Sequence, residues 1–491
     1  MRLRRLTILL LCLCGCASRA TVPSSFSSLA PKNVIVIIGD GMGPQQIALA
    51  FAHERFSRHR QETVKKLTQF CDSSLVGLHI PFTEKHLVND SACAATQLSS
   101  GCGCEPQQVG IDVHSLPCEN AVEVAKKLGM RAGAISDTRL THATPASFGV
   151  HEEHRSMEDS IAWKLSNSPL DVMLSGGLSY FLPRDAAAQG ALPFAVGSVT
   201  SERRDSLNPL ANALGRGYHV VRDKRELSRA SLPVLGLFAT KNMGDAFHEG
   251  RDREPTLAEM TERALTLLEN PNGFFLMVEA GQIDWAGHAN DAGWLLAEMK
   301  RLATLVAVIE RFRQENPDTL VLMTGDHETG GFGFSYTGEP SDGVTSKSSE
   351  GSKLNFGASD VINTLDASSR SLSDISREFA ALPAEQRTPE KLCEMVRDGT
   401  RLELSVESAK TLLSGPEWRS VFYPYPHYIA SARLAALLTP QMNIAWSTGT
   451  HTSTPIPIFA RGPGAERFRG VMNTREFGDR LLALMQARER T

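Results

Sequence analysis

Several side chains that can bind divalent cations follow directly after apolar runs of the sequence. The runs span residues 34–38, 273–278 and 318–324, and the residues that follow them are Asp40, Glu279, Asp326 and His327. Short apolar runs rich in β-branched residues are typical of strands buried on both faces of a parallel sheet. Because open α/β sheets bind ligands at the carboxyl ends of their strands, we expect these side chains to share one site.

A second set of candidate ligands comes from Asp284, His288 and the later His451. Asp284 and His288 are four residues apart, so one helical turn would put both on the same face. A carboxylate and an imidazole at that spacing form half of a zinc site. A surface ion pair is the alternative, and Trp285 between them is more often a packing residue than a ligand contact.

Ser91 lies where a helix is expected to begin. Asn89 or Asp90 can cap this helix, and the small residues after Ser91 let other groups approach closely. The N-terminus of a helix favours anions such as phosphate. Ser91 is therefore a candidate anion contact, with a plain capping serine as the alternative.

Histidines and hydroxyl groups are concentrated in residues 141–155, a stretch that we expect to be irregular. It contains His142 and Thr144. Four further residues are interpreted as a solvated helix face without a chemical role, namely His151, Glu152, Glu153 and His154.

The remaining pattern predicts the scaffold around these residues. Apolar spacing over 291–312 predicts a long helix that covers the sheet, and 372–439 is predicted to be helical. Residues 335–357 are rich in Ser, Gly, Lys and Thr, as in a flexible loop. Two prolines, Pro455 and Pro457, predict that 456–460 is an edge strand.

We expect an α/β fold, a three-layer αβα sandwich with a mostly parallel central sheet flanked by helices. The domain that carries these candidate site residues is predicted to comprise 31–334 and 441–491, with 335–440 as a flexible loop and helical insertion. The insertion supplies no predicted ligand, so we expect it to affect access to the site or dimer contacts, or to be a surface elaboration. The net charge of −4 over 491 residues argues against a nucleic-acid surface.

The first residues predict export. Residues 1–20 combine a basic start with a short apolar core, as in a secretory signal. Leu13-Cys14-Gly15-Cys16 resembles the lipobox of bacterial lipoproteins, which implies lipidation of Cys16 and a location in the periplasm or at the cell surface. Cleavage after Ala20 is the alternative. Residues 21–30 are interpreted as a tether.

Six of the nine cysteines lie outside this leader. In an oxidising compartment some of them are expected to pair, and Cys118 with Cys102 or Cys104 is the most plausible pair. The connectivity stays open, because spacing alone does not determine it.

Taken together, these stretches resemble the alkaline phosphatase family. The motifs occur in the family's order: GDGMG, DSA, HATPA, VEAGQIDWAGH, TGDHE and THT. The resemblance covers residues 32–182, 270–334 and 447–488. It implies two zinc ions, one magnesium ion, small phosphate monoesters as substrates and a homodimer.

Roles carry over from the family residue by residue. Ser91 resembles the nucleophile that becomes phosphorylated and contacts metal, and Arg155 the arginine that grips phosphate. The residues that resemble metal ligands are Asp284, His288 and His451 for one zinc, Asp326 and His327 for the other, Asp40 between zinc and magnesium, and Thr144 and Glu279 for magnesium. His142 replaces the Asp of many bacterial relatives, and Trp285 replaces Lys or His, so both departures lie around magnesium and phosphate.

The resemblance implies hydrolysis of phosphate monoesters through a phosphoserine. A sulfatase of the same superfamily would need a Cys/Ser-x-Pro-x-Arg segment, which Ser91-Ala92-Cys93 is not. The alternatives are a phosphodiesterase of the superfamily, which would lack the third metal site, and a lipoprotein that binds phosphate or metal without catalysis.

Overall fold

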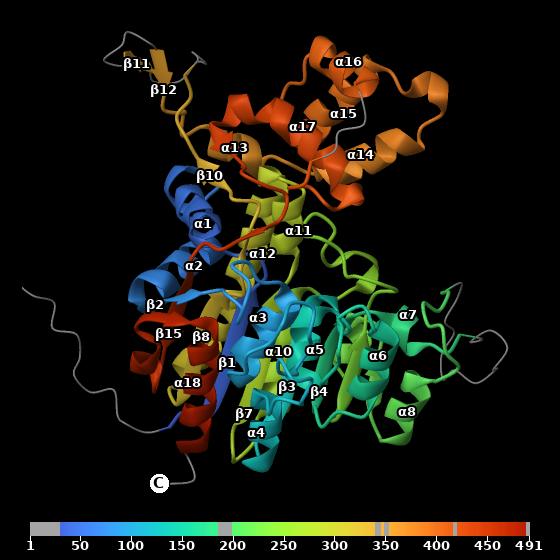
Figure 1. The fold of residues 1–491 in the computed structure, drawn as a ribbon, viewed down its shortest axis with the longest axis vertical. Coiled ribbons are helices and arrows are strands. Elements are labelled where there is room, and N and C mark those ends of the chain that lie inside the picture. The colour runs from blue at the N-terminus through green and yellow to red at the C-terminus, as the bar shows by residue number, and fades with distance from the viewer. Residues whose placement is uncertain (1–29, 185–198, 339–344, 348–352, 416–419, 488–491) are drawn as a thin grey trace, which may run out of the picture.

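The structure is a computed structural model that describes residues 30–184, 199–338, 345–347, 353–415 and 420–487 (Figure 1). The predicted signal, its Cys16 and nearly all of the predicted tether lie outside these residues. None of the helices that the structure describes is long and apolar enough to cross a bilayer.

A ten-stranded sheet forms the centre of the molecule, in the order β16-β2-β15-β8-β1-β7-β3-β4-β6-β5 (Figure 1). Strand β15 runs antiparallel to both of its neighbours, and the other pairings described in this sheet are parallel. The strands are β1 (Asn33–Gly39), β2 (Leu75–Ile80), β3 (Arg131–Arg139), β4 (Val172–Gly176), β5 (His219–Val221), β6 (Val234–Leu237), β7 (Phe274–Ala280), β8 (Thr319–Gly325), β15 (Ile456–Arg461) and β16 (Gly470–Asn473).

Helices cover both faces of this sheet, and β1 shows why. Its residues alternate between two hydrophobic cores: Ile35 and Ile37 face one core, while Val34, Val36 and Ile38 face the other. One layer contains α1 (Pro44–Phe56), α2 (Glu62–Ser73), α10 (Leu257–Leu268) and α12 (Ala292–Glu315). The opposite layer contains α3 (Ser91–Ser100), α4 (Ala121–Lys127), α5 (Ala143–Gly149), α6 (Glu158–Ser166), α8 (Pro209–Gly215) and α18 (Thr474–Gln486). The predicted three-layer αβα fold is confirmed.

The segment predicted as an insertion forms a group of helices beyond one end of the sheet, drawn in orange and red in Figure 1. These helices are α13 (Val361–Asp366), α14 (Leu372–Ala381), α15 (Pro389–Thr400), α16 (Val406–Ser414) and α17 (Pro426–Met442). Thr388 caps α15 through its side chain, as its position before Pro389 predicts. The described part of the predicted flexible loop contains the short strands β11 (Thr345–Lys347) and β12 (Lys353–Asn355). The proposed boundaries of the domains stay a prediction.

Two local predictions are wrong. The strand predicted at the edge of the sheet, β15, lies between β8 and β2. Its register with β8 begins at Ile458, after Pro457, so the missing proline N–H removes no bond from that ladder. Residues 141–155 are not irregular throughout, since α5 occupies 143–149.

The segment after α5 does not form the expected solvated helix face. Glu152 exchanges backbone hydrogen bonds with Val109 at 2.7 and 3.1 Å, which holds this stretch extended. Its neighbour His151 is held at Nε2 by Glu123 at 3.0 Å. A contact with a distant part of the chain thus overrides the local pattern.

Two disulfides join the segment that follows Ser91. Cys102 pairs with Cys118, one of the two expected partners, and Cys93 pairs with Cys104, which the sequence analysis did not anticipate. Among the described residues, Cys71 and Cys393 are free thiols.

Candidate active site

The candidate metal ligands meet at the carboxyl edge of three adjacent strands. Strands β8, β1 and β7 are neighbours in the sheet. Asp326 and Asp40 directly follow β8 and β1, and Glu279 is the last residue but one of β7. His327 Nε2 lies 3.4 Å from Asp40 Oδ1 and 3.3 Å from Asp326 Oδ2. All four side chains are completely buried. The strand pattern therefore brings them together as expected.

The turn after β1 lets a helix approach this edge. Gly41 has φ +76°, and a Cβ there would lie 2.6 Å from the Cα of Asp284. Its backbone N–H donates to Asp326 Oδ1 at 3.2 Å. A glycine is required because any side chain would push away the helix α11 (Gln282–His288) that carries Asp284.

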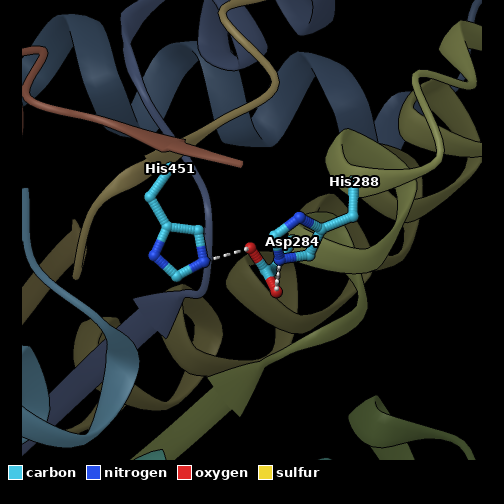
Figure 2. A group of neighbouring side chains, drawn as sticks. All are labelled: Asp284, His288 and His451. Atoms are coloured by element: carbon cyan, nitrogen blue, oxygen red, sulfur yellow. Dashed lines mark ion pairs between the residues drawn. The ribbon is translucent and has the colours of Figure 1, made fainter. Parts of the chain in front are cut away.

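A second group forms around α11. Asp284 and His288 lie on one face of the helix, with His288 Nε2 3.2 Å from Asp284 Oδ2. His451 Nε2 lies 3.6 Å from Asp284 Oδ1, and Figure 2 shows the three side chains converging on one point. His451 lies beside Asp284 because its strand β14 (His451–Thr452) pairs with β9 (Glu328–Thr329). Strand β9 begins directly after His327.

Hydrogen bonds to the other ring nitrogen orient each histidine. Nδ1 of His288 lies 2.7 Å from the carbonyl of Gly449, and Nδ1 of His451 lies 2.9 Å from the carbonyl of Asn89. A carbonyl only accepts, so each Nδ1 carries a proton, and in the neutral imidazole each Nε2 then keeps its lone pair. This is the tautomer that a metal ligand needs.

A third group contains Asp40, Glu279 and His142, whose candidate ligand atoms all lie within 4.8 Å of one another. Thr144 Oγ1 donates to Asp40 Oδ2 at 3.4 Å, and His142 Nδ1 lies 3.6 Å from Glu279 Oε1. Thr138 donates to Glu279 Oε2 at 3.3 Å. Ser136 donates to the same oxygen. The sequence analysis missed Ser136 and Thr138, although both follow the apolar start of β3.

Ser91 and Arg155 lie beside these groups. Ser91 is the first residue of α3, whose N-cap is Asp90, and its Oγ lies 3.3 Å from His327 Nε2. Arg155 donates from Nη1 to Asp90 Oδ2 at 3.0 Å, while its Nη2 lies 3.2 Å from His142 Nε2. Burial opposes the ionisation of Asp90, but Arg155 and two backbone N–H groups lower its pKa. The guanidinium is therefore held in place by an ionised carboxylate.

The buried charges of the site fit divalent cations. Burial and the neighbouring carboxylates Asp326, Asp284 and Glu279 raise the pKa of Asp40 well above its ordinary value. Burial and Asp284 raise the pKa of Asp326 to about 8. Four of the buried atoms that lack a hydrogen-bond partner among the described residues belong to this site, namely Asp40 Oδ1, Glu279 Oε1, Asp326 Oδ2 and His142 Nδ1. Cations at these atoms would satisfy them and neutralise the repulsion.

Comparison with known proteins agrees with this geometry. The family model described as Alkaline phosphatase matches residues 31–373. The chain belongs to the alkaline phosphatase family. It is therefore a phosphatase, a hydrolase of a metal-dependent family, as the sequence predicts.

Three of the similar proteins match at least nine tenths of the chain. Alkaline phosphatase 4 of Bacillus subtilis is 29% identical over 458 residues, which are 90% of this chain and 86% of that protein. The alkaline phosphatase structure from Thermus thermophilus is 25% identical with a TM-score of 0.77, and the match spans 93% of this chain and 91% of the chain in that structure. The structure of the cold-active alkaline phosphatase from Shewanella sp. is 25% identical with a TM-score of 0.72, and the match spans 92% of this chain and 99% of the chain in that structure.

A pocket of about 560 Å³ opens onto the site of this phosphatase. Ser91 and Arg155 line it, and so does Trp285, whose ring meets the His142 ring edge-on at 6.1 Å. His151 and His154 do not line it. The lining residues that the sequence analysis missed are Gln107, Arg139, Asn242, Tyr425, His427 and Tyr428.

Two of these missed residues come from the helical segment and contact a metal-ligand candidate. The Tyr428 ring stacks on His288 at 5.7 Å, and the Tyr425 ring meets it edge-on at 4.7 Å. Tyr425 is the N-cap residue of α17 and Tyr428 lies in its first turn, more than a hundred residues further along the chain than His288. No local sequence pattern indicates this contact.

Gly41→Ala should displace α11, because its Cβ would overlap the backbone of Asp284. We expect turnover to fall on the order of a hundredfold, the cost of misplacing a catalytic group by about 1 Å, with loss of bound metal. Gly217→Ala is the matched control, since Gly217 has φ +87° but open space around it. The control should lose about 1–2 kcal/mol of stability and keep its metal and turnover. Equal metal content and turnover in both variants would contradict this explanation.

Proposed function

We propose that this phosphatase hydrolyses small phosphate monoesters through a phosphoserine at Ser91. The observation that carries the proposal is that Ser91 and Arg155 line one pocket with Asp284, His288 and His451. Ser91 Oγ also lies 3.3 Å from Nε2 of His327, which belongs to the second group of candidate ligands. A nucleophile, an oxyanion-binding cation and cation sites are what phosphoryl transfer requires.

Two zinc ions and one magnesium ion fit the three groups. One zinc would be held by Asp284, His288 and His451, since histidine with carboxylate is a common zinc ligand set. The other would be held by Asp326, His327 and Asp40. Magnesium would take Asp40, Thr144 and Glu279, which supply oxygen ligands. When bound, these ions neutralise the phosphate charge and act as Lewis acids on its oxygens.

The side chains themselves position the substrate for an in-line displacement. The planar guanidinium of Arg155, anchored by Asp90, can donate two parallel hydrogen bonds to phosphate oxygens. The N-terminus of α3 adds a favourable field for the anion. Ser91 Oγ forms a bond to phosphorus while the ester's leaving oxygen departs as the alcohol. Water then cleaves the phosphoserine, releases phosphate and restores the serine.

The third group argues for a monoesterase over a phosphodiesterase. A relative that acts on diesters would keep the two zinc groups and lack the third site, whereas Thr144 and Glu279 both face Asp40 in this chain. A lipoprotein that only binds phosphate or metal would not need a nucleophile, and Ser91 lines the pocket.

Ser91→Ala should lose turnover of a generic aryl phosphate on the order of 10³-fold or more, yet still bind inorganic phosphate through Arg155 and the metal sites. Ser100→Ala, at the other end of the same helix, is the control and should keep its turnover. Acid quenching with labelled phosphate should mark Ser91 alone. Near-normal turnover of Ser91→Ala, or label on another residue, would refute the assignment.

His142 is proposed to weaken magnesium binding. Its ring lies beside Glu279, where an aspartate would add a negative charge and accept hydrogen bonds from magnesium-bound water. The imidazole nitrogen favours zinc instead. The alternative is that His142 only packs against Trp285.

We expect the purified enzyme to be partly magnesium-deficient and activated by added magnesium. His142→Asp should then bind magnesium about tenfold more tightly, within the range for residues that support ligands. Calorimetric magnesium titrations and activation curves are compared after stripping the metals and restoring zinc. The control is His59→Asp, which changes an exposed histidine. Superimposable curves for the wild type and His142→Asp would rule the idea out.

We further propose that the phosphatase is exported to the periplasm or cell surface, is held there by a lipid on Cys16, and forms a homodimer. The support is the lipobox-like Leu13-Cys14-Gly15-Cys16 for the anchor and the family resemblance for the dimer. A single acyl chain binds a membrane weakly, so a stable anchor needs more than one.

Labelled fatty acid should be incorporated into the wild type and into Cys14→Ser, but not into Cys16→Ser. Wild-type protein should leave the membrane fraction only with detergent, because a multiply acylated terminus partitions into the bilayer. Mass spectrometry of the mature N-terminus provides a second measurement. A soluble mature chain that begins after Ala20 would contradict the anchor.

A further inference from the structure

A fourth group of ligand-type side chains lies outside the active site. Asp245, His248 and Asp374 each offer a ligand atom, and these atoms lie within 4.8 Å of one another. Asp245 and His248 belong to the loop between β6 and α10, while Asp374 is in the first turn of α14. The group therefore joins the catalytic sheet to the helical segment.

The loop side of this group is ordered by its own hydrogen bonds. The backbone N–H of His248 donates to the carbonyl of Asp245 at 2.8 Å, and the N–H of Phe247 donates to Asp245 Oδ1 at 3.0 Å. His248 Nδ1 lies 2.6 Å from the same oxygen. Contacts within the loop thus hold the His248 imidazole beside the Asp245 carboxylate without any contact from Asp374.

Asp374 supplies an independent indication of a ligand. Its side chain is 9% exposed, and its Oδ2 is buried without a hydrogen-bond partner among the residues that the structure describes. Arg377 contacts the other oxygen, Oδ1. A buried carboxylate oxygen without a partner is costly, and a cation shared with Asp245 and His248 would remove that cost.

The surroundings add further negative charge. Asp291 lies behind the group and accepts from the backbone N–H of Leu372, at the start of α14, at 2.6 Å. Burial raises the pKa of Asp291 to about 6, and the charge of Asp245 adds to this. Glu298 Oε1 accepts from the N–H of Ala246 at 2.9 Å. Glu298 is paired with Arg301 at 2.6 Å, so the additional negative charge beside the group comes from Asp291.

We propose that Asp245, His248 and Asp374 bind a divalent cation of the zinc type, separate from the three groups at the active site. One imidazole nitrogen and two carboxylates form a mixed donor set that suits zinc, whereas calcium and magnesium prefer oxygen ligands alone. Water completes the coordination of a site with three protein ligands.

The ion would fix the wall of the active-site pocket. Helix α14 packs against α17, and α17 carries Tyr425 and Tyr428 onto the ring of His288. A link between α14 and the loop after β6 therefore restrains the aromatic residues that border the substrate. The site supplies structure and takes no part in phosphoryl transfer.

Zinc stoichiometry of the full chain tests this site directly. The wild type, Asp374→Asn and His248→Ala are stripped of metal, reloaded with zinc, desalted and measured by elemental mass spectrometry. Arg377→Gln is the matched control, because it removes only the ion pair with Asp374. The wild type and the control should retain about one more zinc per chain than the two ligand variants.

Anomalous diffraction at the zinc edge gives a second measurement, with a peak expected between Asp245, His248 and Asp374. His248 is 37% exposed on its side chain, so His248→Ala decides the question if Asp374→Asn does not fold. Equal zinc content in all four proteins, or zinc-loaded crystals without the peak, would overturn the proposal. Neither result depends on Ser91, so the proposed function is tested separately.

Discussion

Repulsion between buried carboxylates is the constraint on which the rest of this structure depends. Four of them converge at the carboxyl edge of the sheet: Asp40, Glu279, Asp284 and Asp326. The positive charge of Arg155, which lines the pocket, acts on Asp40. Burial opposes the ionisation of all four, and Asp284 and Glu279 add to the cost of ionising Asp40 and Asp326. Neighbouring histidines lower the pKa of Asp284 and Glu279 themselves. The edge is therefore built to be completed by cations, and because the ligands must be ionised to hold them, metal binding is coupled to proton release. The surrounding layers serve to hold this unfavourable arrangement rigidly.

Much of this arrangement could be predicted from the sequence, because two short-range rules generate it. A buried strand that ends at an acid places the acid at the ligand edge, which holds for Asp40, Glu279 and Asp326. A spacing of four residues places Asp284 and His288 on one helical face. Both rules depend on backbone periodicity, which neighbouring residues determine.

The features that could not be predicted depend on contacts between distant segments. Tyr428 reaches His288 only because the helical segment folds back over the pocket. The extended stretch at Glu152 depends on Val109. The interior position of β15 depends on its pairing with both β8 and β2, in which Pro457 pairs with Leu78 of β2 and lies outside the β8 register. In each case the local pattern is compatible with more than one structure, and a tertiary contact selects between them.

The disulfide Cys93–Cys104 makes the bracing of helix α3 depend on the redox state of its surroundings. Cys93 lies on α3, two residues after Ser91, and the second bond, Cys102–Cys118, continues from the same loop. Such bonds persist in oxidising compartments and are rare in the reducing cytosol. The helix that begins at Ser91 thus acquires its covalent bracing only under oxidising conditions. Under the export proposed above, the enzyme would gain this bracing only after it has left the compartment that holds the cell's own phosphate esters.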